Sequence, residues 1–237
     1  MTGEYKITHD HMKALGPCAD GWRDFLTAYP REEYPDGVAY QDILDRCADE
    51  GSIDYAYWLI HKIGPTDDVR EYTEEIVDAD KHIAFAGTII FRKNATVKNI
   101  TAGGSIVADE SIEAGGSITA GLSIKAGGSI DAGVDITAGG IITAGGYIKA
   151  GLSIKAGGII TAGVDITAGL SITADESIKA GGIITAGGSI DAGVDITAGL
   201  SIKAGGSIDA GVDITAGGII KAKTKPKNIV YGEYQQI

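Results

Sequence analysis

Isoleucine recurs at every sixth position from Ile100 to Ile220, and an Ala follows two residues after each of these isoleucines. Side chains alternate between the two faces of a β-strand, so the Ile and Ala of one unit lie on one side. The residue between them lies on the other side, and it is Thr, Lys, Asp or Glu in all units but one. Gly follows the Ala in nearly every unit, where a sharp corner needs backbone freedom. The pattern predicts a solenoid of short stacked strands.

The glycine content of this array excludes other regular structures. Gly occupies about a quarter of residues 100–222, and each Gly inside an α-helix costs about 0.5–1 kcal/mol relative to Ala. Gly does not recur at every third position, as collagen requires. We therefore predict a parallel β-helix. Three six-residue sides make an eighteen-residue coil, so the twenty-one units predict about seven three-sided coils, with a two-sided coil of twelve residues as the alternative.

The first 65 residues have apolar positions at helical spacing in four stretches. These stretches cover residues 8–15, 19–29, 40–50 and 52–63, and they stop at Gly16, Pro30, Gly51 and Gly64. The predicted fold class is α+β and multidomain, with a small N-terminal helical domain followed by the β-helix. The predicted parts are an acidic helical domain (1–66), an acidic linker (67–81), a capping coil of the solenoid (82–99), the hexapeptide-repeat β-helix (100–222) and a C-terminal cap or tail (223–237).

The net charge of −12 lies entirely in residues 1–80, which hold nineteen acidic and seven basic side chains; residues 81–237 hold thirteen of each. Direct binding of this region to nucleic acid is disfavoured because phosphate would be repelled. Either the charge keeps the chain in solution, or it forms an acidic surface that docks onto a basic partner protein or imitates nucleic acid. The candidate partner-binding residues are Glu32, Glu33, Asp36, Asp42, Asp45, Asp49, Glu50, Asp54, Asp67, Asp68, Glu71, Glu74 and Glu75.

Two more features concern the outside of the predicted rod. Val134, Leu152 and Leu170 fall in one column at a corner position usually held by Gly. They predict either an apolar seam for self-association or packing within the corner. Residues 221–227 hold four lysines. We interpret this stretch as an end cap whose charges discourage strand pairing, with a basic tail for nucleic acid as the alternative.

No residue pattern typical of catalysis, cofactor binding or metal binding stands out. The four His all precede the array, and no phosphate-binding loop or nucleophile motif occurs. We therefore predict a protein that is not an enzyme and has no cofactor or metal. Cys18 and Cys47 fall in different predicted helices, where they are either buried thiols or a disulfide.

The sequence gives no sign of secretion or of membrane insertion. The N-terminus lacks the apolar segment of a signal peptide, and no run of eighteen apolar residues occurs. We expect a cytoplasmic protein, in a bacterial host cell, with no membrane partner.

The array resembles hexapeptide-repeat solenoids, including bacterial bactofilins, which are cytoskeletal proteins built from β-helices. Three other stretches resemble a small helical module found at the start of phage and prophage proteins. They read Leu15-Gly-Pro-Cys-Ala-Asp-Gly-Trp22, Tyr34-Pro-Asp-Gly-Val-Ala-Tyr-Gln-Asp-Ile-Leu-Asp45 and Ile53-Asp-Tyr-Ala-Tyr-Trp-Leu-Ile60. This resemblance implies a protein of a phage or mobile element. Small acidic proteins of that origin often inhibit bacterial defence systems, including CRISPR complexes.

Three functions follow as expectations. In the first, the acidic helical domain binds and inhibits a host protein or protein complex. A host complex that itself binds nucleic acid is a candidate for this partner. The solenoid then serves as a rigid body or an oligomerisation surface. In the second, the chain is a self-assembling scaffold similar to bactofilins, and a homo-oligomer. In the third, an enzyme site lies between the helical domain and the rod.

Overall fold

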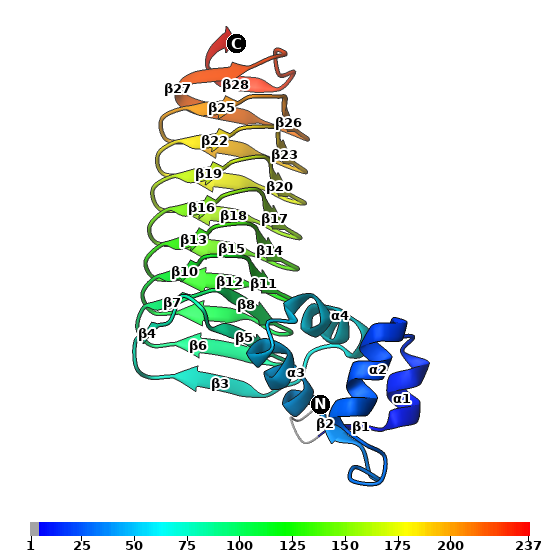
Figure 1. Cartoon of the computed structure of the whole chain (residues 1–237). Coiled ribbons are helices and arrows are strands. Elements are labelled where there is room, and N and C mark those ends of the chain that lie inside the picture. The colour runs from blue at the N-terminus through cyan, green and yellow to red at the C-terminus, as the bar shows by residue number, and fades with distance from the viewer. Residues whose placement is uncertain (1–4) are drawn as a thin grey trace.

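The computed structural model describes residues 5–237. It has a small helical domain beside one end of a parallel β-solenoid, and the solenoid continues to the C-terminus (Figure 1). The predicted fold class is confirmed. No helix within residues 5–237 is long and apolar enough to cross a membrane.

Four helices build the small domain, close to the positions predicted from spacing. They are α1 (His9–Ala14), α2 (Ala19–Ala28), α3 (Tyr40–Asp49) and α4 (Ile53–Ile63). The Thr8 hydroxyl accepts a hydrogen bond from the His11 backbone N–H at 3.2 Å and so caps α1, and Gly16, at φ 75°, follows its end. A short antiparallel pair of strands that the sequence pattern did not indicate, β1 (Lys6–Ile7) and β2 (Val38–Ala39), joins both ends of the α1–α2 segment.

The solenoid has three faces. The first face contains β3 (Val69–Tyr72), β6 (Thr88–Phe91), β9 (Ile106–Ala108), β12 (Ile124–Ala126), β15 (Ile142–Ala144), β18 (Ile160–Ala162), β21 (Ile178–Ala180) and β24 (Ile196–Ala198). The second contains β4 (Ile76–Val77), β7 (Ala95–Val97), β10 (Ile112–Ala114), β13 (Ile130–Ala132), β16 (Ile148–Ala150), β19 (Ile166–Ala168), β22 (Ile184–Ala186) and β25 (Ile202–Ala204).

The third face contains β5 (His82–Phe85), β8 (Asn99–Ala102), β11 (Ile118–Ala120), β14 (Ile136–Ala138), β17 (Ile154–Ala156), β20 (Ile172–Ala174), β23 (Ile190–Ala192) and β26 (Ile208–Ala210). At the C-terminal end, the long strand β27 (Ile214–Ala222) pairs with β24 on the first face and then with β25 on the second face. The last strand, β28 (Ile229–Gln236), pairs with β27 in parallel.

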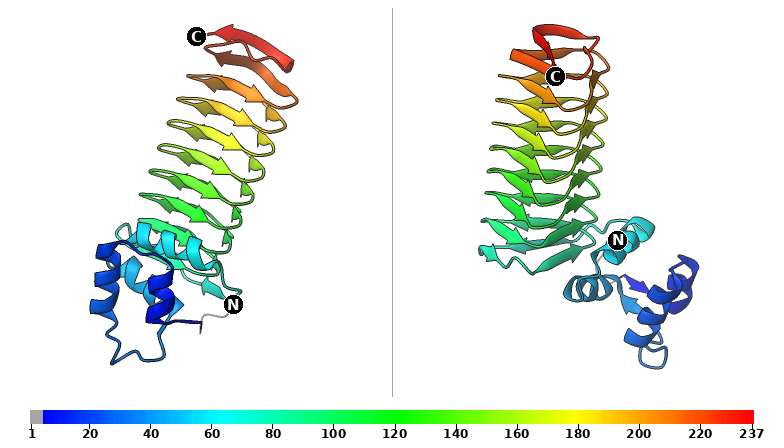
Figure 2. Two further views of the ribbon diagram at one scale, coloured as in Figure 1. Left: turned by 90° about the vertical axis from the view of Figure 1, so that its right-hand side faces the viewer. Right: turned by 45° about the horizontal axis from the view of Figure 1, so that its top comes forward.

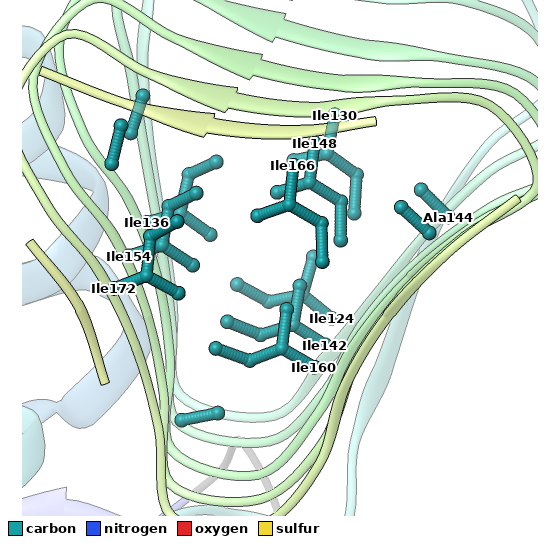
Figure 3. Close-up of a cluster of buried hydrophobic side chains, with 14 of the residues drawn as sticks. Ile124, Ile130, Ile136, Ile142, Ala144, Ile148, Ile154, Ile160, Ile166 and Ile172 are labelled. Atoms are coloured by element: carbon teal, nitrogen blue, oxygen red, sulfur yellow. The ribbon is translucent and has the colours of Figure 1, made fainter. Parts of the chain in front are cut away.

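Isoleucines stack in three columns inside this triangle. Ile124 pairs with Ile142 and Ile142 with Ile160, each eighteen residues apart, and all three are fully buried. Figure 3 shows this column facing two others, one from each remaining face. Alanines stack beside the isoleucines and are also buried. The three-sided coil of eighteen residues is therefore confirmed over the two-sided alternative.

In many units a polar residue precedes the Ile, and its side chain accepts a hydrogen bond from the backbone of the next coil. The backbone N–H of Ser117 donates to the side-chain oxygen of Asn99 at 2.7 Å, and that of Ser153 donates to an Asp135 carboxylate oxygen at 2.8 Å. A hydroxyl or carboxylate at this position thus accepts from the coil above, which accounts for the frequent Ser and Asp there.

The solenoid has about nine coils, so the expected count of seven was wrong. Residues before the array also wind into it. Val69 pairs with Thr88, nineteen residues on, and Ile89 pairs with Ile106, seventeen residues on. Strands β3 and β4 thus lie within residues 67–81, where a linker was expected, and the C-terminal segment adds β28. Because these coils have nineteen and seventeen residues, the six-residue period does not extend into them, and the repeat pattern could not reveal them.

Candidate functional site

The helical domain is attached to the third face of the solenoid at its N-terminal end, where α3 packs on β5 and α4 packs on β5 and β8 (Figure 2). The Gln41 side chain of α3 donates to the Ala84 carbonyl at 2.9 Å and accepts from the Ala86 N–H at 3.1 Å. Gln41 thereby bonds to a backbone C=O and a backbone N–H, as a neighbouring strand would. This side chain of α3 is thus bonded directly to the backbone at the edge of the solenoid.

A half-buried ion pair strengthens this junction. The Arg70 guanidinium of β3 donates to both carboxylate oxygens of Asp45 on α3, at 2.8 and 3.1 Å. It also lies over the Phe85 ring, 4.6 Å from the centroid. Burial is the largest single effect and lowers the pKa of Arg70, but the hydrogen bond and charge of Asp45, together with those of Tyr72, outweigh it, so the pKa is raised. Asp45, a predicted partner-binding residue, therefore holds the fold together.

Several other predicted partner-binding carboxylates are also engaged within the chain. Glu50 pairs with Arg46 at 2.7 Å, and Glu74 pairs with Lys93 at 2.8 Å. Glu71 pairs with Arg92 at 2.5 Å. Asp68 is half-buried, and one of its oxygens has no hydrogen-bond partner among the described residues. Exposed pairs of this kind contribute at most about 1 kcal/mol each, but they reduce the charge that a partner would meet.

The remaining predicted carboxylates point outward. Asp42 and Asp49 lie on α3, Asp54 lies in the first turn of α4, and Asp67 and Glu75 belong to the first coil; all are exposed. A second group, Glu32, Glu33 and Asp36, lies in the loop of residues 30–37 between α2 and β2, and it too is exposed. The structure therefore separates the predicted surface into a structural set and an outward set.

The loop of residues 30–37 is held in a defined shape. Its Arg31 donates to Asp10 of α1 at 2.7 Å, and this bond lowers the pKa of the Asp10 carboxyl. The Pro30 carbonyl accepts from the backbone N–H groups of Glu33 and Tyr34 at 3.1 and 3.0 Å. The Tyr34 ring packs edge-on against Tyr29, 5.3 Å away. The three outward carboxylates of the loop are therefore displayed from an ordered turn.

A groove that sequence analysis did not indicate runs between α4 and the third face. It consists of two adjoining hollows of about 430 and 460 Å³, which share Tyr57, Thr119 and Thr137. One hollow is polar, with Asp54 and Asn99 in its wall, and the other is mainly apolar. Two segments far apart in sequence, residues 51–65 and residues 99–157, line opposite sides of the groove, so no local motif could reveal it.

Cys18 and Cys47 line one cavity of about 210 Å³ in the helical domain, and both are free thiols. Cys47 is buried, as expected, and burial raises the pKa of its thiol to about 12. Cys18 is exposed, because it lies at the start of α2, where its sulfur accepts from the Gly21 N–H at 3.3 Å. The disulfide alternative is therefore absent from this structure.

The two thiols should react at very different rates. The thiolate is the reactive form, and the raised pKa of Cys47 leaves almost none of it at pH 8. We expect a thiol-specific chromogenic reagent to modify one thiol per native chain within minutes and the second only in denaturant. A Cys18→Ser variant should lose the fast reaction. Two equally fast thiols in the native wild type would contradict the burial of Cys47.

The predicted seam lies along one edge of the solenoid. Leu152 donates its N–H to the Val134 carbonyl, and Leu170 donates to the Leu152 carbonyl, both at 2.8 Å. Leu152 and Leu170 are 42% and 53% exposed, while Val134 is half-buried. Single apolar residues at the other two edges, such as Leu122 and Leu200, are equally exposed. The seam's role in self-association stays a prediction.

The described histidines have structural partners. The buried His9 ring contacts the Tyr29 carbonyl through Nε2 at 2.7 Å, and the His82 ring contacts the Asn99 amide at 3.0 Å. Within residues 5–237, no three His, Cys, Asp or Glu side chains gather as metal ligands would.

Comparison with protein-family models, with curated proteins and with solved structures finds no match to this chain.

Proposed function

We propose that this chain is a non-enzymatic binding protein of phage or mobile-element type. In this proposal it inhibits a host protein complex, in the manner of an anti-CRISPR or other anti-defence inhibitor, through the acidic surface of its helical domain. The solenoid is the rigid body on which that surface is mounted. The phage assignment rests on the resemblance of residues 15–60 to phage modules, and the mode of action rests on the charge and its geometry.

The observation that carries the proposal is the ordered loop of residues 30–37. Its carboxylates Glu32, Glu33 and Asp36 are exposed, and no ion pair joins them to any residue in 5–237. Asp42 and Asp49 continue the charge along α3. Carboxylates held at a fixed spacing repel nucleic acid and attract the basic surface of a protein that binds it.

The expected test is capture of a host complex by the purified chain from a bacterial lysate, followed by inhibition of that complex by the chain. Neutralising the loop with Glu32→Gln, Glu33→Gln and Asp36→Asn should reduce capture and inhibition at least about tenfold, because electrostatic steering and rim contacts are lost. Duplex DNA should displace the captured complex if the loop occupies a surface that binds nucleic acid.

The matched control removes the same charge from the rod. This control carries Glu113→Gln, Asp191→Asn and Asp209→Asn. The three positions are exposed on the outside of the solenoid and lie far along the chain from the loop. This variant should capture the complex as well as the wild type does. Equal capture by the loop variant and the wild type would show that the acidic loop is not the binding surface.

A further inference from the structure

The two ends of the solenoid carry opposite charge. Residues 67–81, which form most of the first coil, hold seven acidic and two basic side chains, a net charge of −5. Residues 214–237, which form the last coil, hold four lysines and one Glu, a net charge of +3. At the acidic end, Arg92 and Lys93 pair with Glu71 and Glu74, which leaves Glu75 and Asp80 exposed to solvent.

The lysines of the other end project from one loop. Lys223, Lys225 and Lys227 lie between β27 and β28, are exposed, and join no ion pair within residues 5–237. Asn228 of this loop donates its side-chain amide to the Ala210 carbonyl at 2.8 Å, which places the loop over the end of the third face. The helical domain lies on that same face at the opposite end (Figure 1). Two rods aligned end to end would bring the lysine loop of one toward α3 of the next, where Asp49 is exposed.

The strands at both ends have one unpaired edge. Among the described residues, β3 pairs only with β6 and β4 only with β7, while β28 pairs only with β27. Each end thus offers unpaired strand edges on the first and second faces. Unpaired backbone N–H and C=O groups at such an edge are a template for another strand.

Apolar side chains accompany these open edges. Val69 and Val77 at the acidic end are 58% and 75% exposed. Val230 and Tyr231 at the lysine-rich end are 65% and 63% exposed. Each end therefore combines an open edge, exposed apolar side chains and a charge that the other end complements.

We propose that the lysine-rich end of one copy of this chain docks onto the acidic end of a second copy, so that the solenoid continues from copy to copy. Contacts between two different surfaces that do not close into a ring produce an open filament. The lysines discourage pairing only between two like ends, because ends of like charge repel each other, and this selects head-to-tail addition over the two symmetric arrangements. Salt weakens the attraction between exposed charges, so assembly should decrease as ionic strength rises.

Sedimentation velocity over a range of protein concentrations tests this contact. At low salt the wild type should form a concentration-dependent series of species, each one chain larger than the last. A tail variant, with Lys223→Glu, Lys225→Glu and Lys227→Glu, should sediment as a single small species. A head variant, with Asp49→Lys, Glu75→Lys and Asp80→Lys, should do the same.

An equimolar mixture of the two variants makes the test specific. The tail variant is acidic at both ends, and the head variant carries lysines at the exposed head positions where the wild type has carboxylates, so neither should stack on itself. In the mixture each tail meets a complementary head, and the series of larger species should return. Matched circular dichroism spectra and melting curves would show that both variants fold.

A charge-matched control separates this contact from general repulsion. This control carries Lys125→Glu, Lys179→Glu and Lys203→Glu, all at exposed positions along the rod. It changes the net charge by the same amount as the tail variant does. This variant should assemble as the wild type does. A wild type that remains a single small species at low salt, or a mixture that fails to reassemble, would overturn the proposal.

Discussion

Replacing Ile142 by Asp is expected to lower the free energy of unfolding by more than about 4 kcal/mol. Ile142 is fully buried between Ile124 and Ile160 in the first-face column. The substitution removes the packing of an Ile and leaves a carboxylate without a partner in an apolar interior. The midpoint of urea unfolding, followed by far-ultraviolet circular dichroism, measures the effect.

The neighbouring residue supplies the control. Ile141 is 44% exposed at the position before the strand, and in its own column Asp occupies positions 195 and 213. Ile141→Asp should therefore shift the free energy of unfolding by no more than about 0.5 kcal/mol. Similar losses from Ile141→Asp and Ile142→Asp would contradict the inward register of the isoleucines.

Gly145→Ala is expected to destabilise the solenoid by about 1–3 kcal/mol. A Cβ at this corner would lie 2.1 Å from the Gly127 carbonyl oxygen of the coil below, so the two coils must separate. The array carries a Cβ at two such corners: Asp109, whose N–H donates to the Phe91 carbonyl at 2.9 Å, and Asp175, where the bonds are longer. The Asp175 N–H donates to the Ala156 carbonyl at 3.2 Å, and the next N–H, of Glu176, donates at 3.3 Å, whereas other corner bonds are mostly shorter.

Gly115→Ala is the matched substitution. Gly115 occupies the same position in its unit, but no atom lies within 4 Å of an added Cβ, and its φ is not positive. Ala there restricts the unfolded chain without strain in the folded one, so stability should stay the same or rise by about 0.4–1 kcal/mol. Thermal melts of both variants decide the point, and equal destabilisation would show that corner spacing is not the cause.

The regular part of the fold could be predicted from sequence because one physical rule repeats. Ile and Ala two residues apart must share a side of a strand, and three six-residue sides close a coil of eighteen residues. The first coil was predicted as a linker, and residues 82–99 only as a capping coil outside the repeat, because Val69 and Thr88 pair across nineteen residues and Ile89 and Ile106 across seventeen. There the core is filled by bulkier side chains such as Phe85 and Phe91, which have no periodic signature.

The acidic surface was predicted less completely. The sequence identifies the carboxylates, but it does not show which Lys or Arg side chains pair with them in the fold. Asp45 and Arg70 are 25 residues apart and meet only because α3 packs on β5, in the same coil as β3. The groove along α4 has the same origin, and so does the placement of the acidic residues 67–81 at one end of the rod. Each depends on distances between residues that become neighbours only after the coil has wound.

The uniform pairing of coils has a consequence for how such a chain changes over generations. Each coil in the array presents to the next the same Ile and Ala columns at the same eighteen-residue spacing. Recombination between near-identical repeats can therefore delete or duplicate a whole coil without creating a new kind of contact. Each event lengthens or shortens the rod by about 4.8 Å. The number of coils in the array thus sets the distance between the helical domain and the lysine-rich end.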